Sequence, residues 1–367
     1  IYSNEWLAKE IKSLKNYPNL IIKNRTSLAA FHGYNYLLAR ENLTDHLSIS
    51  DRKNKIRQRL WKIRAKKVII ASGSIERPLI FSNNDRPGII LSSSIKKYID
   101  YYGVKTGENI SLFTNNDSAY ETAISLNKSG VKVNVIVDIR KNSESLIVKE
   151  ALDLGLKVLW ESTVVETQGY KKIKSFEVMK LSDDGNNVIG NKTKHNCDCL
   201  GISGGWTPMV HLFTQSGGKL KFRNEDNVFI PDQDKTPPNQ ISVGSCNGEF
   251  KLDEIVTRTI ENLKSFLDLS KTCYDEMKIN CPDEKSKRNI WLLPSDKPIG
   301  KTKPFLDFQN DSTAKDVKLA LREGFKSIEH VKRYTTTGMG TDQGKLSNMH
   351  ALGIIADTTG TNMGELG

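Results

Sequence analysis

The chain has 367 residues, a length that suits two or three domains and allows a substantial core. Hydrophobic residues make up 37% and charged residues 26% of it, as in soluble proteins, and no apolar run approaches the roughly 18 residues of a membrane span. The formal net charge is +11, but lysine and arginine are spread along the chain apart from clusters at 52–59 and 62–67. This pattern argues against a nucleic-acid partner, and an acidic partner subunit or anionic cofactor phosphates explain it better.

The ends and the cysteines indicate where the protein works. Residues 1–5 have neither the basic nor the apolar segment of a signal peptide, and we expect both ends of the chain to be cut. The cysteines are odd in number and scattered, which predicts free thiols in a reducing cytoplasm: Cys197, Cys199, Cys246, Cys273 and Cys281. The first two are too close together for a usual zinc site, and we expect Cys199 to be a buried strand residue.

Periodicity predicts the elements in chain order. Apolar residues at helical spacing predict a helix at the start, followed by a strand at 20–22 and a long polar stretch. A strand over 66–70 runs into a small-residue turn at 71–73, and an amphipathic helix covers 89–103. Residues 109–160 alternate as strand 109–113, helix 118–129, strand 131–137, helix 144–154 and strand 156–160. Such a βαβαβ unit predicts a parallel sheet.

The second half is less regular. Strands near 163–181 and 188–194 predict an antiparallel excursion, and the apolar run 199–203 returns to the core. A strand over 240–244 precedes a helix near 251–269. Mixed charge and several prolines predict a linker over 270–300, and 301–350 form a separate small unit that is mostly helical.

Two strand ends carry the first functional signal. Ala71, Ser72 and Gly73 follow a buried strand, and small residues there let the backbone approach a nucleotide. Gly244 and Ser245 follow another strand and precede a helix, whose amides can face a pyrophosphate. Each motif alone also fits a plain strand-to-loop turn.

Together the two motifs bracket the 109–200 unit. This suggests one nucleotide-binding domain interrupted by another, as in two-dinucleotide-binding flavoproteins resembling glutathione reductase, and residues 205–208 match the turn that such proteins place before the return. Thr26 is included among the candidate cofactor-binding residues.

The inserted unit carries a damaged fingerprint. After the strand at 110–113, the G-x-G-x-x-G/A-x-E frame falls on Thr114, Asn116, Ala119 and Glu121. The last two fit, but side chains at Thr114 and Asn116 crowd the turn that a pyrophosphate needs. Asp138 ends the next strand, where a ribose-binding acid lies in such folds. We predict a retained fold without its ligand, with a bound dinucleotide as the alternative.

The block at 305–347 carries the last signal. Lys332, Arg333 and Lys345 lie near Thr335, Thr336 and several glycines, a mixture that suits a phosphate. The alternative is a capped helix with solvated lysines. No second histidine or cysteine lies at metal spacing from His330, so we expect no metal. The turn at 83–88 (Asn-Asn-Asp-Arg-Pro-Gly) fits a plain loop.

Several segments in succession are specific together. They are 59–66 (RLWKIRAK), 71–79 (ASGSIERPL), 83–88 (NNDRPG), 114–120 (TNNDSAY), 203–208 (SGGWTP), 307–311 (DFQND) and 329–336 (EHVKRYTT). This succession resembles the alpha subunits of heterotetrameric sarcosine oxidases over nearly the whole chain. The resemblance implies NAD in this chain, FMN at the boundary with the beta subunit, and FAD with the amine-oxidising site in the beta subunit. It also implies beta, gamma and delta partner subunits and a tetrahydrofolate-binding domain beyond the C-terminal end.

The implied reaction oxidises sarcosine to glycine, transfers the one-carbon unit to tetrahydrofolate and produces hydrogen peroxide. Related amine and opine dehydrogenase subunits carry four iron–sulfur cysteines in the small domain. Asp307, Gln309, Asp342 and Ser347 fall at those positions here. Iron–sulfur clusters need thiolates, so we expect the fold to be kept and the cluster lost, which favours the sarcosine oxidase branch.

The expected fold is therefore α/β, like a flavoprotein with two dinucleotide-binding domains, plus a small helical domain resembling a cysteine-less iron–sulfur domain. The expected division is part of the first dinucleotide-binding domain (1–107), the inserted second (108–200), the return to the first (201–270), a linker (271–300), the small domain (301–350) and the start of a C-terminal domain (351–367). No nucleophile–base pair or pair of carboxylates suggests catalytic residues in this chain. The alternatives are the alpha subunit of a proline, hydroxyproline or opine dehydrogenase, or a nucleotide-stabilised scaffold.

Overall fold

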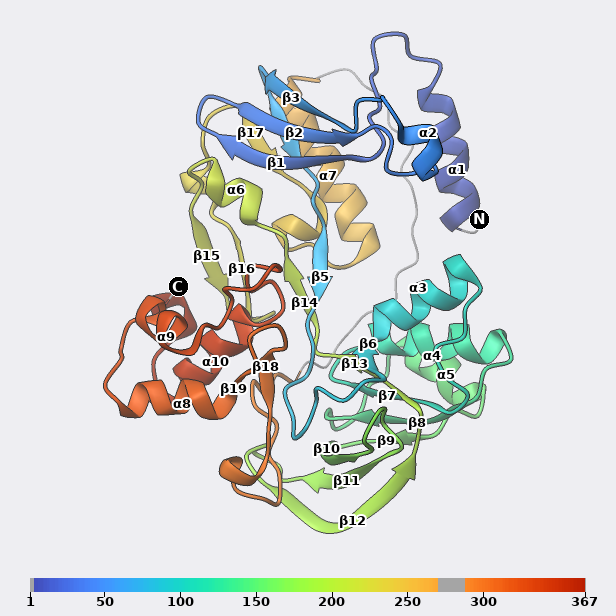
Figure 1. The fold of residues 1–367 in the computed structure, drawn as a ribbon, viewed down its shortest axis with the longest axis vertical. Helices are drawn as coiled ribbons and strands as arrows, with labels where there is room; N and C mark the ends of the chain where they lie inside the picture. Colours follow the sequence, from blue (N-terminus) through green and yellow to red (C-terminus); the bar gives the residue numbers. More distant parts are fainter. Residues whose placement is uncertain (1–2, 270–287, 367) are drawn as a thin grey trace. The chain divides into compact units, whose positions relative to one another are not determined.

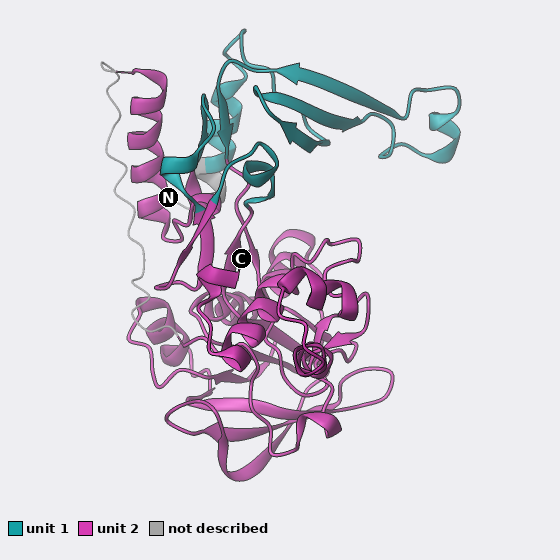
Figure 2. Ribbon diagram, turned by 90° about the vertical axis from the view of Figure 1, so that its left-hand side faces the viewer, with its two compact units in different colours: residues 1–70, 210–219, 231–242 teal, residues 71–209, 220–230, 243–367 magenta. Residues whose placement is uncertain are grey.

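A computed structural model describes residues 3–269 and 288–366 and divides the chain into two compact units. Unit 1 comprises residues 1–70, 210–219 and 231–242, and unit 2 comprises residues 71–209, 220–230 and 243–367 (Figure 2). The chain therefore crosses between the units several times, and each unit is assembled from segments far apart in the sequence.

Unit 1 is built around a three-stranded antiparallel meander. Its elements are α1 (Ser3–Leu14), β1 (Thr26–His32), β2 (Tyr36–Asn42), α2 (Ile49–Arg52), β3 (Gln58–Arg64), β4 (Val68–Ile70), α6 (His211–Gln215), the 3₁₀ turn η1 (Gln233–Lys235) and β17 (Gln240–Ser242). The strand predicted at 20–22 is wrong, because these residues are irregular and the side chain of Ile21 is 79% exposed, with no neighbouring strand to cover it. The meander lies where the sequence predicts only a long polar stretch, and its strand β3 has three basic residues and six exposed positions out of seven.

Unit 2 contains a five-stranded parallel sheet in the order β6-β13-β7-β8-β9 (Figure 1). The strands are β6 (Ile89–Leu91), β7 (Ile110–Thr114), β8 (Val133–Asp138), β9 (Val158–Leu159) and β13 (Cys199–Ser203). Helices α3 (Ser92–Tyr102), α4 (Ser118–Lys128) and α5 (Leu146–Asp153) pack on one face. The predicted βαβαβ unit and its parallel sheet are confirmed.

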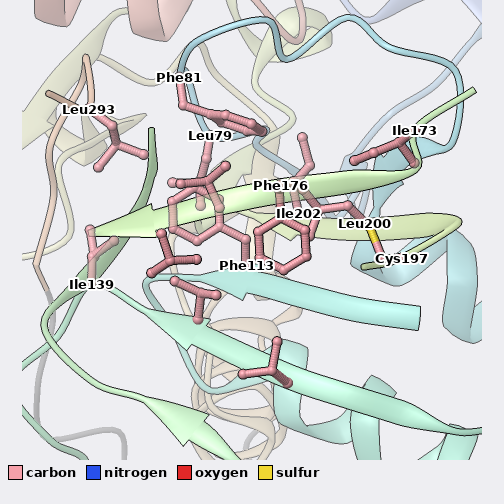
Figure 3. Packing of buried hydrophobic residues seen from close by; sticks show 14 of the residues in the cluster. Leu79, Phe81, Phe113, Ile139, Ile173, Phe176, Cys197, Leu200, Ile202 and Leu293 are labelled. Atoms are coloured by element: carbon pink, nitrogen blue, oxygen red, sulfur yellow. The ribbon is translucent and has the colours of Figure 1, made fainter. Parts of the chain in front are cut away.

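The other face of this sheet is covered by the antiparallel strands β10 (Ser162–Gln168), β11 (Ser175–Leu181) and β12 (Val188–Asn196). Successive strand residues point to opposite faces, so Leu112 joins the helical core whereas Phe113 joins the core between the sheets. In that core the rings of Phe81 and Phe113 meet edge to face at 5.3 Å, close to Phe176 (Figure 3). Cys199 is 1% exposed on β13, as predicted.

Short elements complete the middle of unit 2. They are the antiparallel pair β5 (Ser74–Glu76) and β14 (Trp206–Pro208), the pair β15 (Leu220–Arg223) and β16 (Val228–Pro231), the 3₁₀ turn η2 (Gly244–Asn247) and α7 (Leu252–Leu267). No described helix, in either unit, is both long and apolar enough to span a bilayer.

The C-terminal part of unit 2 has its own core. Its elements are η3 (Ile299–Lys301), β18 (Phe305–Asp307), β19 (Ser312–Thr313), α8 (Ala314–Arg322), α9 (Ile328–Thr335), α10 (Asn348–Thr359) and α11 (Met363–Leu366). Helix α8 begins with a capping box formed by Thr313 and Asp316. Helix α10 runs through the predicted boundary at residue 350, because its apolar residues on both sides of that point enter the same core.

The predicted linker lies partly outside the described residues. In its described part, Trp291 and Leu293 are 8% and 3% exposed and enter two different cores. The part of this segment around Trp291 and Leu293 is therefore packed, although its mixed composition resembles a linker. The rest of the predicted domain division stays a prediction.

Candidate functional site

The first candidate site follows the strands β4 and β17. These strands are parallel, with Ile70 opposite Ser242, so the chain leaves both at the same edge. Ala71, Ser72 and Gly73 follow one strand, and Gly244 begins η2 after the other. The two predicted strand ends are thus adjacent, as nucleotide binding at the carboxyl ends of parallel strands requires.

Backbone geometry explains the glycines at this edge. Gly73 and Gly244 have φ values of +77° and +73°, a region that residues with a Cβ rarely adopt. A Cβ on Gly73 would lie 3.9 Å from Oγ of Ser245, which is ordinary van der Waals contact, so the two loops lie close to each other. In this cradle Ala71 and Ser72 are exposed, whereas Gly73, Gly244 and Ser245 are half-buried. Its small residues would let a pyrophosphate approach the backbone.

Ser72 has a supporting role in this cradle. Its Oγ donates to the carbonyl of Met209 at 2.7 Å, and the amide of Met209 donates to the carbonyl of Gly73 at 3.0 Å. Thr26, the remaining first-site candidate, begins β1 in unit 1, and its hydroxyl donates to the carbonyl of Asn24 at 3.0 Å.

The second candidate site, at the end of β7, is filled by its own side chains. Oγ1 of Thr114 donates to the carbonyl of Asn116 and accepts from its amide, at 3.0 and 3.1 Å. The side-chain amide of Asn116 donates to Oγ of Ser203 at 2.9 Å, and its carbonyl oxygen accepts from the amide of Ser118 at 3.0 Å. These side chains lie within the turn and bond to one another there, as the predicted crowding requires. The absence of a bound dinucleotide stays a prediction.

Asp138 ends β8 as predicted, but its carboxylate is held inside the protein. Arg140 donates to it through Nε at 3.1 Å and Nη2 at 2.7 Å, and Tyr120 donates through its hydroxyl at 2.8 Å. Nη1 of Arg140 also contacts Oδ1 of Asp117 at 2.7 Å. The side chains of Arg140 and Asp138 are both 0% exposed, so this carboxylate does not face a ribose.

Burial alone would lower the pKa of Arg140, but its hydrogen bonds and charge attraction to Asp138 outweigh burial and raise the pKa. Arg140 and the two carboxylates of Asp138 and Asp117 therefore form a buried ion-pair network whose partners all come from this chain. The sequence analysis did not predict a role for Arg140. The one signal that could have indicated it is its position, two residues after Asp138.

In the third candidate site, the 305–347 block, some of the polar groups expected to hold a phosphate are already hydrogen-bonded to other residues of the block. Thr335 is 8% exposed, and its hydroxyl donates to the carbonyl of Val331 at 2.8 Å. The amide of Gly338 donates to Oδ2 of Asp307 at 2.7 Å. Neither group therefore faces outward to hold a phosphate, whereas Thr336 is exposed.

Three cations of the same block remain accessible to a ligand. Arg333 is exposed, Lys332 and Lys345 are half-buried, and both Lys332 and Arg333 lie in the last turn of α9. Cations near a helix C-terminus also interact favourably with the helix dipole, so their placement fits a structural role as well.

The residues at the cysteine positions bond to the surrounding loop. Oδ1 of Asp307 accepts from the amide of Gln309 at 2.9 Å, and Oδ1 of Asp342 accepts from the amide of Gly344 at 3.1 Å. Ser347 is 1% exposed. Oxygen acceptors thus satisfy loop amides, and no group of three metal-binding side chains occurs within residues 3–269 and 288–366.

Comparison with known proteins identifies the family. The chain is 33% identical to the sarcosine oxidase subunit alpha of Corynebacterium sp. (strain P-1) over 99% of its own length, and 33% identical to that of Rhizobium meliloti (strain 1021) over 96%. The chain belongs to the family of sarcosine oxidase alpha subunits. It spans 38% and 34% of the lengths of these two family members. A family model described as the sarcosine oxidase A3 domain matches residues 301–367, which include the whole of α10 and α11.

Solved structures support the fold of this family member. L-proline dehydrogenase from P. horikoshii matches with a TM-score of 0.68 over 98% of this chain and 65% of that one, at 19% identity. Thioredoxin reductase from T. acidophilum matches with a TM-score of 0.53 over 73% of this chain and 80% of that one, at 18% identity. The predicted flavoprotein-like α/β fold is confirmed, while the likeness of the small domain to an iron–sulfur domain stays a prediction.

Proposed function

We propose that this chain is the dinucleotide-binding part of a sarcosine oxidase alpha subunit. The observation that carries the proposal is the identity of about one third with such subunits over nearly the whole chain. The assembled enzyme would oxidise sarcosine to glycine and reduce oxygen to hydrogen peroxide, with the methyl carbon passing to tetrahydrofolate. Electrons leave the substrate at a flavin of a partner subunit, and this chain positions cofactors.

Within this function, the cradle formed by Ala71–Gly73 and Gly244–Ser245 binds NAD. The support is that both glycines have a positive φ and that the residues around them are small, so that a dinucleotide pyrophosphate can approach the backbone closely. Thr26 is the remaining candidate ligand. FMN at the boundary with the beta subunit, FAD in the beta subunit, gamma and delta subunits and a cytoplasmic location belong to the same proposal.

Replacing Gly73 with Leu tests the cradle, because the side chain would project between the two loops. We expect the assembled enzyme to lose most of its bound dinucleotide, measured by release and chromatography. Gly103→Leu is the matched control: Gly103 also has a positive φ, of +63°, with open space around it at the end of α3. A folded Gly73→Leu enzyme with as much nucleotide as the control would contradict the proposal.

The activity is tested by co-purifying the chain with its partner subunits and measuring peroxide formation with sarcosine. Proline, hydroxyproline and an opine, each with an artificial electron acceptor, test the dehydrogenase alternative. Turnover of one of these without turnover of sarcosine would refute the proposed substrate. Binding of nucleotide and partners without turnover of any amine would favour the scaffold.

The small domain is proposed to carry no iron and to support the boundary FMN through Lys332, Arg333 and Lys345. One exposed and two half-buried cations suit a flavin phosphate, whereas solvated lysines alone would contribute at most roughly 1 kcal/mol each. Stoichiometric iron in the pure protein would refute the first half. Replacing the three cations with Ala should lower the FMN content, and unchanged FMN content with intact subunit association would refute the second half.

A further inference from the structure

The positive charge of the chain is concentrated in one segment. Residues 1–70 contain 15 lysines and arginines but only five aspartates and glutamates, which gives this segment a net charge of +10 out of +11 for the whole chain. Basic residues occur along the entire sequence, but the acidic residues that balance them elsewhere are scarce in this segment. The segment belongs to unit 1 and includes the meander of β1, β2 and β3 (Figure 1). The surplus of charge therefore lies in unit 1.

Strand pairing divides the meander into two faces. Successive strand residues point to opposite sides, and residues paired across strands point to the same side. Leu37 and Ala39 are buried, so their side is the inner face. Arg40, Lys62 and Arg64 are exposed and lie on the other side. This outer face is formed on β2 and β3 by Tyr36, Leu38, Arg40, Leu60, Lys62 and Arg64.

The three cations of the outer face are not neutralised by a carboxylate of the described residues. Within residues 3–269 and 288–366, Arg40, Lys62 and Arg64 form no ion pair. The acidic residue of β2, Glu41, points to the inner face, where it pairs with Arg59 at 3.6 Å. The described part of the chain therefore leaves the positive charge of the outer face uncompensated.

Apolar side chains lie among these cations. Leu60 is paired with Arg40 and is 58% exposed. Tyr36 is paired with Arg64, whose guanidinium lies 5.2 Å from the centre of the tyrosine ring. Arginine and tyrosine are enriched at protein interfaces, and an exposed leucine between them adds apolar area to such a contact. The outer face therefore combines unpaired cations with side chains that suit a protein partner.

A simpler explanation accounts for only part of this face. Strand β3 is an edge of the three-stranded sheet, and charged residues on an edge strand prevent pairing with other sheets. Lys62 and Arg64 fit that role. Arg40 does not, because β2 is the central strand, and neither does the exposed Leu60, because an apolar residue makes an edge more prone to association.

We propose that the outer face docks an acidic surface of a partner protein subunit. The inference rests on the proposed function only in taking that partner from the assembled enzyme. Opposite potentials across an interface steer association and fix its register, and the net charge of residues 1–70 supplies one of the two potentials. A protein partner fits better than a nucleic acid, because Leu38 and Leu60 gain nothing from phosphates but suit the apolar part of a protein interface.

Charge reversal tests the docking face. In the full-length alpha subunit, Arg40→Glu, Lys62→Glu and Arg64→Glu are combined, and association with each purified partner subunit is measured by titration calorimetry. All three side chains are exposed, so the variant should fold, and its Tm shows whether it does. We expect the Kd for one partner subunit to rise more than about tenfold, since like charges then face each other across the interface.

A matched control carries the same change of charge elsewhere in unit 1. Lys9, Lys12 and Lys15 are exposed in α1 or directly after it, and replacing all three with Glu should leave every Kd unchanged. Association of the unmodified subunit should also weaken as NaCl is raised, and this measurement decides the matter if the outer-face variant does not fold. Equal Kd values for the outer-face variant and the control would overturn the proposal, and so would an association that is the same at low and high salt.

Two further measurements distinguish other partners and the proposed function. Suppose the unmodified subunit binds double-stranded DNA or vesicles containing phosphatidylserine, and the outer-face variant loses this binding while every subunit Kd stays unchanged. The partner would then be a nucleic acid or a membrane, and the proposal would be wrong. Sarcosine turnover by an enzyme that assembles normally with the outer-face variant would overturn only the docking face. Loss of association in that variant, in an enzyme that oxidises another amine, would support the docking face and refute the proposed substrate.

Discussion

Replacement of Arg140 with Met should destabilise unit 2 more than any surface change. The guanidinium is 0% exposed and contacts carboxylates of Asp138 and Asp117, both at 2.7 Å. Methionine of similar length leaves these two acids buried without a cation. Removing one partner of a buried ion pair typically costs about 3–5 kcal/mol, so we expect a loss of this size in the free energy of unfolding.

The neighbouring residue supplies a matched control. Lys141 pairs with Asp183 at 3.0 Å, but their side chains are 61% and 91% exposed, and exposed pairs contribute at most about 1 kcal/mol. Lys141→Met should therefore change the free energy of unfolding by much less than Arg140→Met.

Urea unfolding followed by circular dichroism measures both variants. Asp138→Asn combined with Arg140→Met should cost less than the sum of the two single changes, because the residues share one network. If Arg140→Met proves no more damaging than Lys141→Met, or if the double change is additive, the buried ion pair does not stabilise the unit as argued.

Three further predictions follow from burial and from the filled second site. Burial lowers the pKa of His350 from 6.5 to about 3, so as the pH falls the unfolded state binds a proton before the folded state does, and the free energy of unfolding falls by about 1.4 kcal/mol for each pH unit between 6.5 and 3. His350→Phe should therefore remove roughly 2 kcal/mol of the loss of stability between pH 7 and pH 5. An unchanged pH profile in urea titrations would show that His350 does not cause this loss. Burial raises the pKa of Cys197 to about 12 and of Cys199 to about 11, so at pH 8 both should resist iodoacetamide in the native protein and react in denaturant, as read by peptide mass spectrometry. The turn around Thr114 and Asp138 should bind neither NADH nor NADPH, and a crystal soaked in either that shows a pyrophosphate against this turn would contradict the filled site.

The sequence by itself determined the βαβαβ unit and the antiparallel strands that follow it. These elements have strong local periods, since side chains of strands alternate and those of helices recur every three to four residues. It also predicted the small-residue strand ends, because a position with a positive φ, such as that of Gly73, strongly favours glycine and can be recognised from the residue type. The meander of unit 1 was not predicted, and its third strand, β3, shows why: six of its seven residues are exposed and three are basic, so it has no apolar alternation.

Local patterns also failed where an isolated apolar segment needed a partner. Residues 20–22 read as a strand but have none beside them, whereas Trp291 and Leu293 stand in a segment of linker-like composition and are buried by residues far away in the chain. Whether a short segment is a strand, a linker or part of a core depends on what lies against it, and composition does not record this.

Only the tertiary structure decided which polar side chains are hydrogen-bonded within the protein and which could still bind a ligand. Asp138 lies at the predicted strand end, but Arg140 and Tyr120 hold its carboxylate, and Asp307 accepts the amide of Gly338, 31 residues away. Residue types show which hydrogen bonds are possible, but only the folded chain brings the partners together and excludes the water that would otherwise replace them.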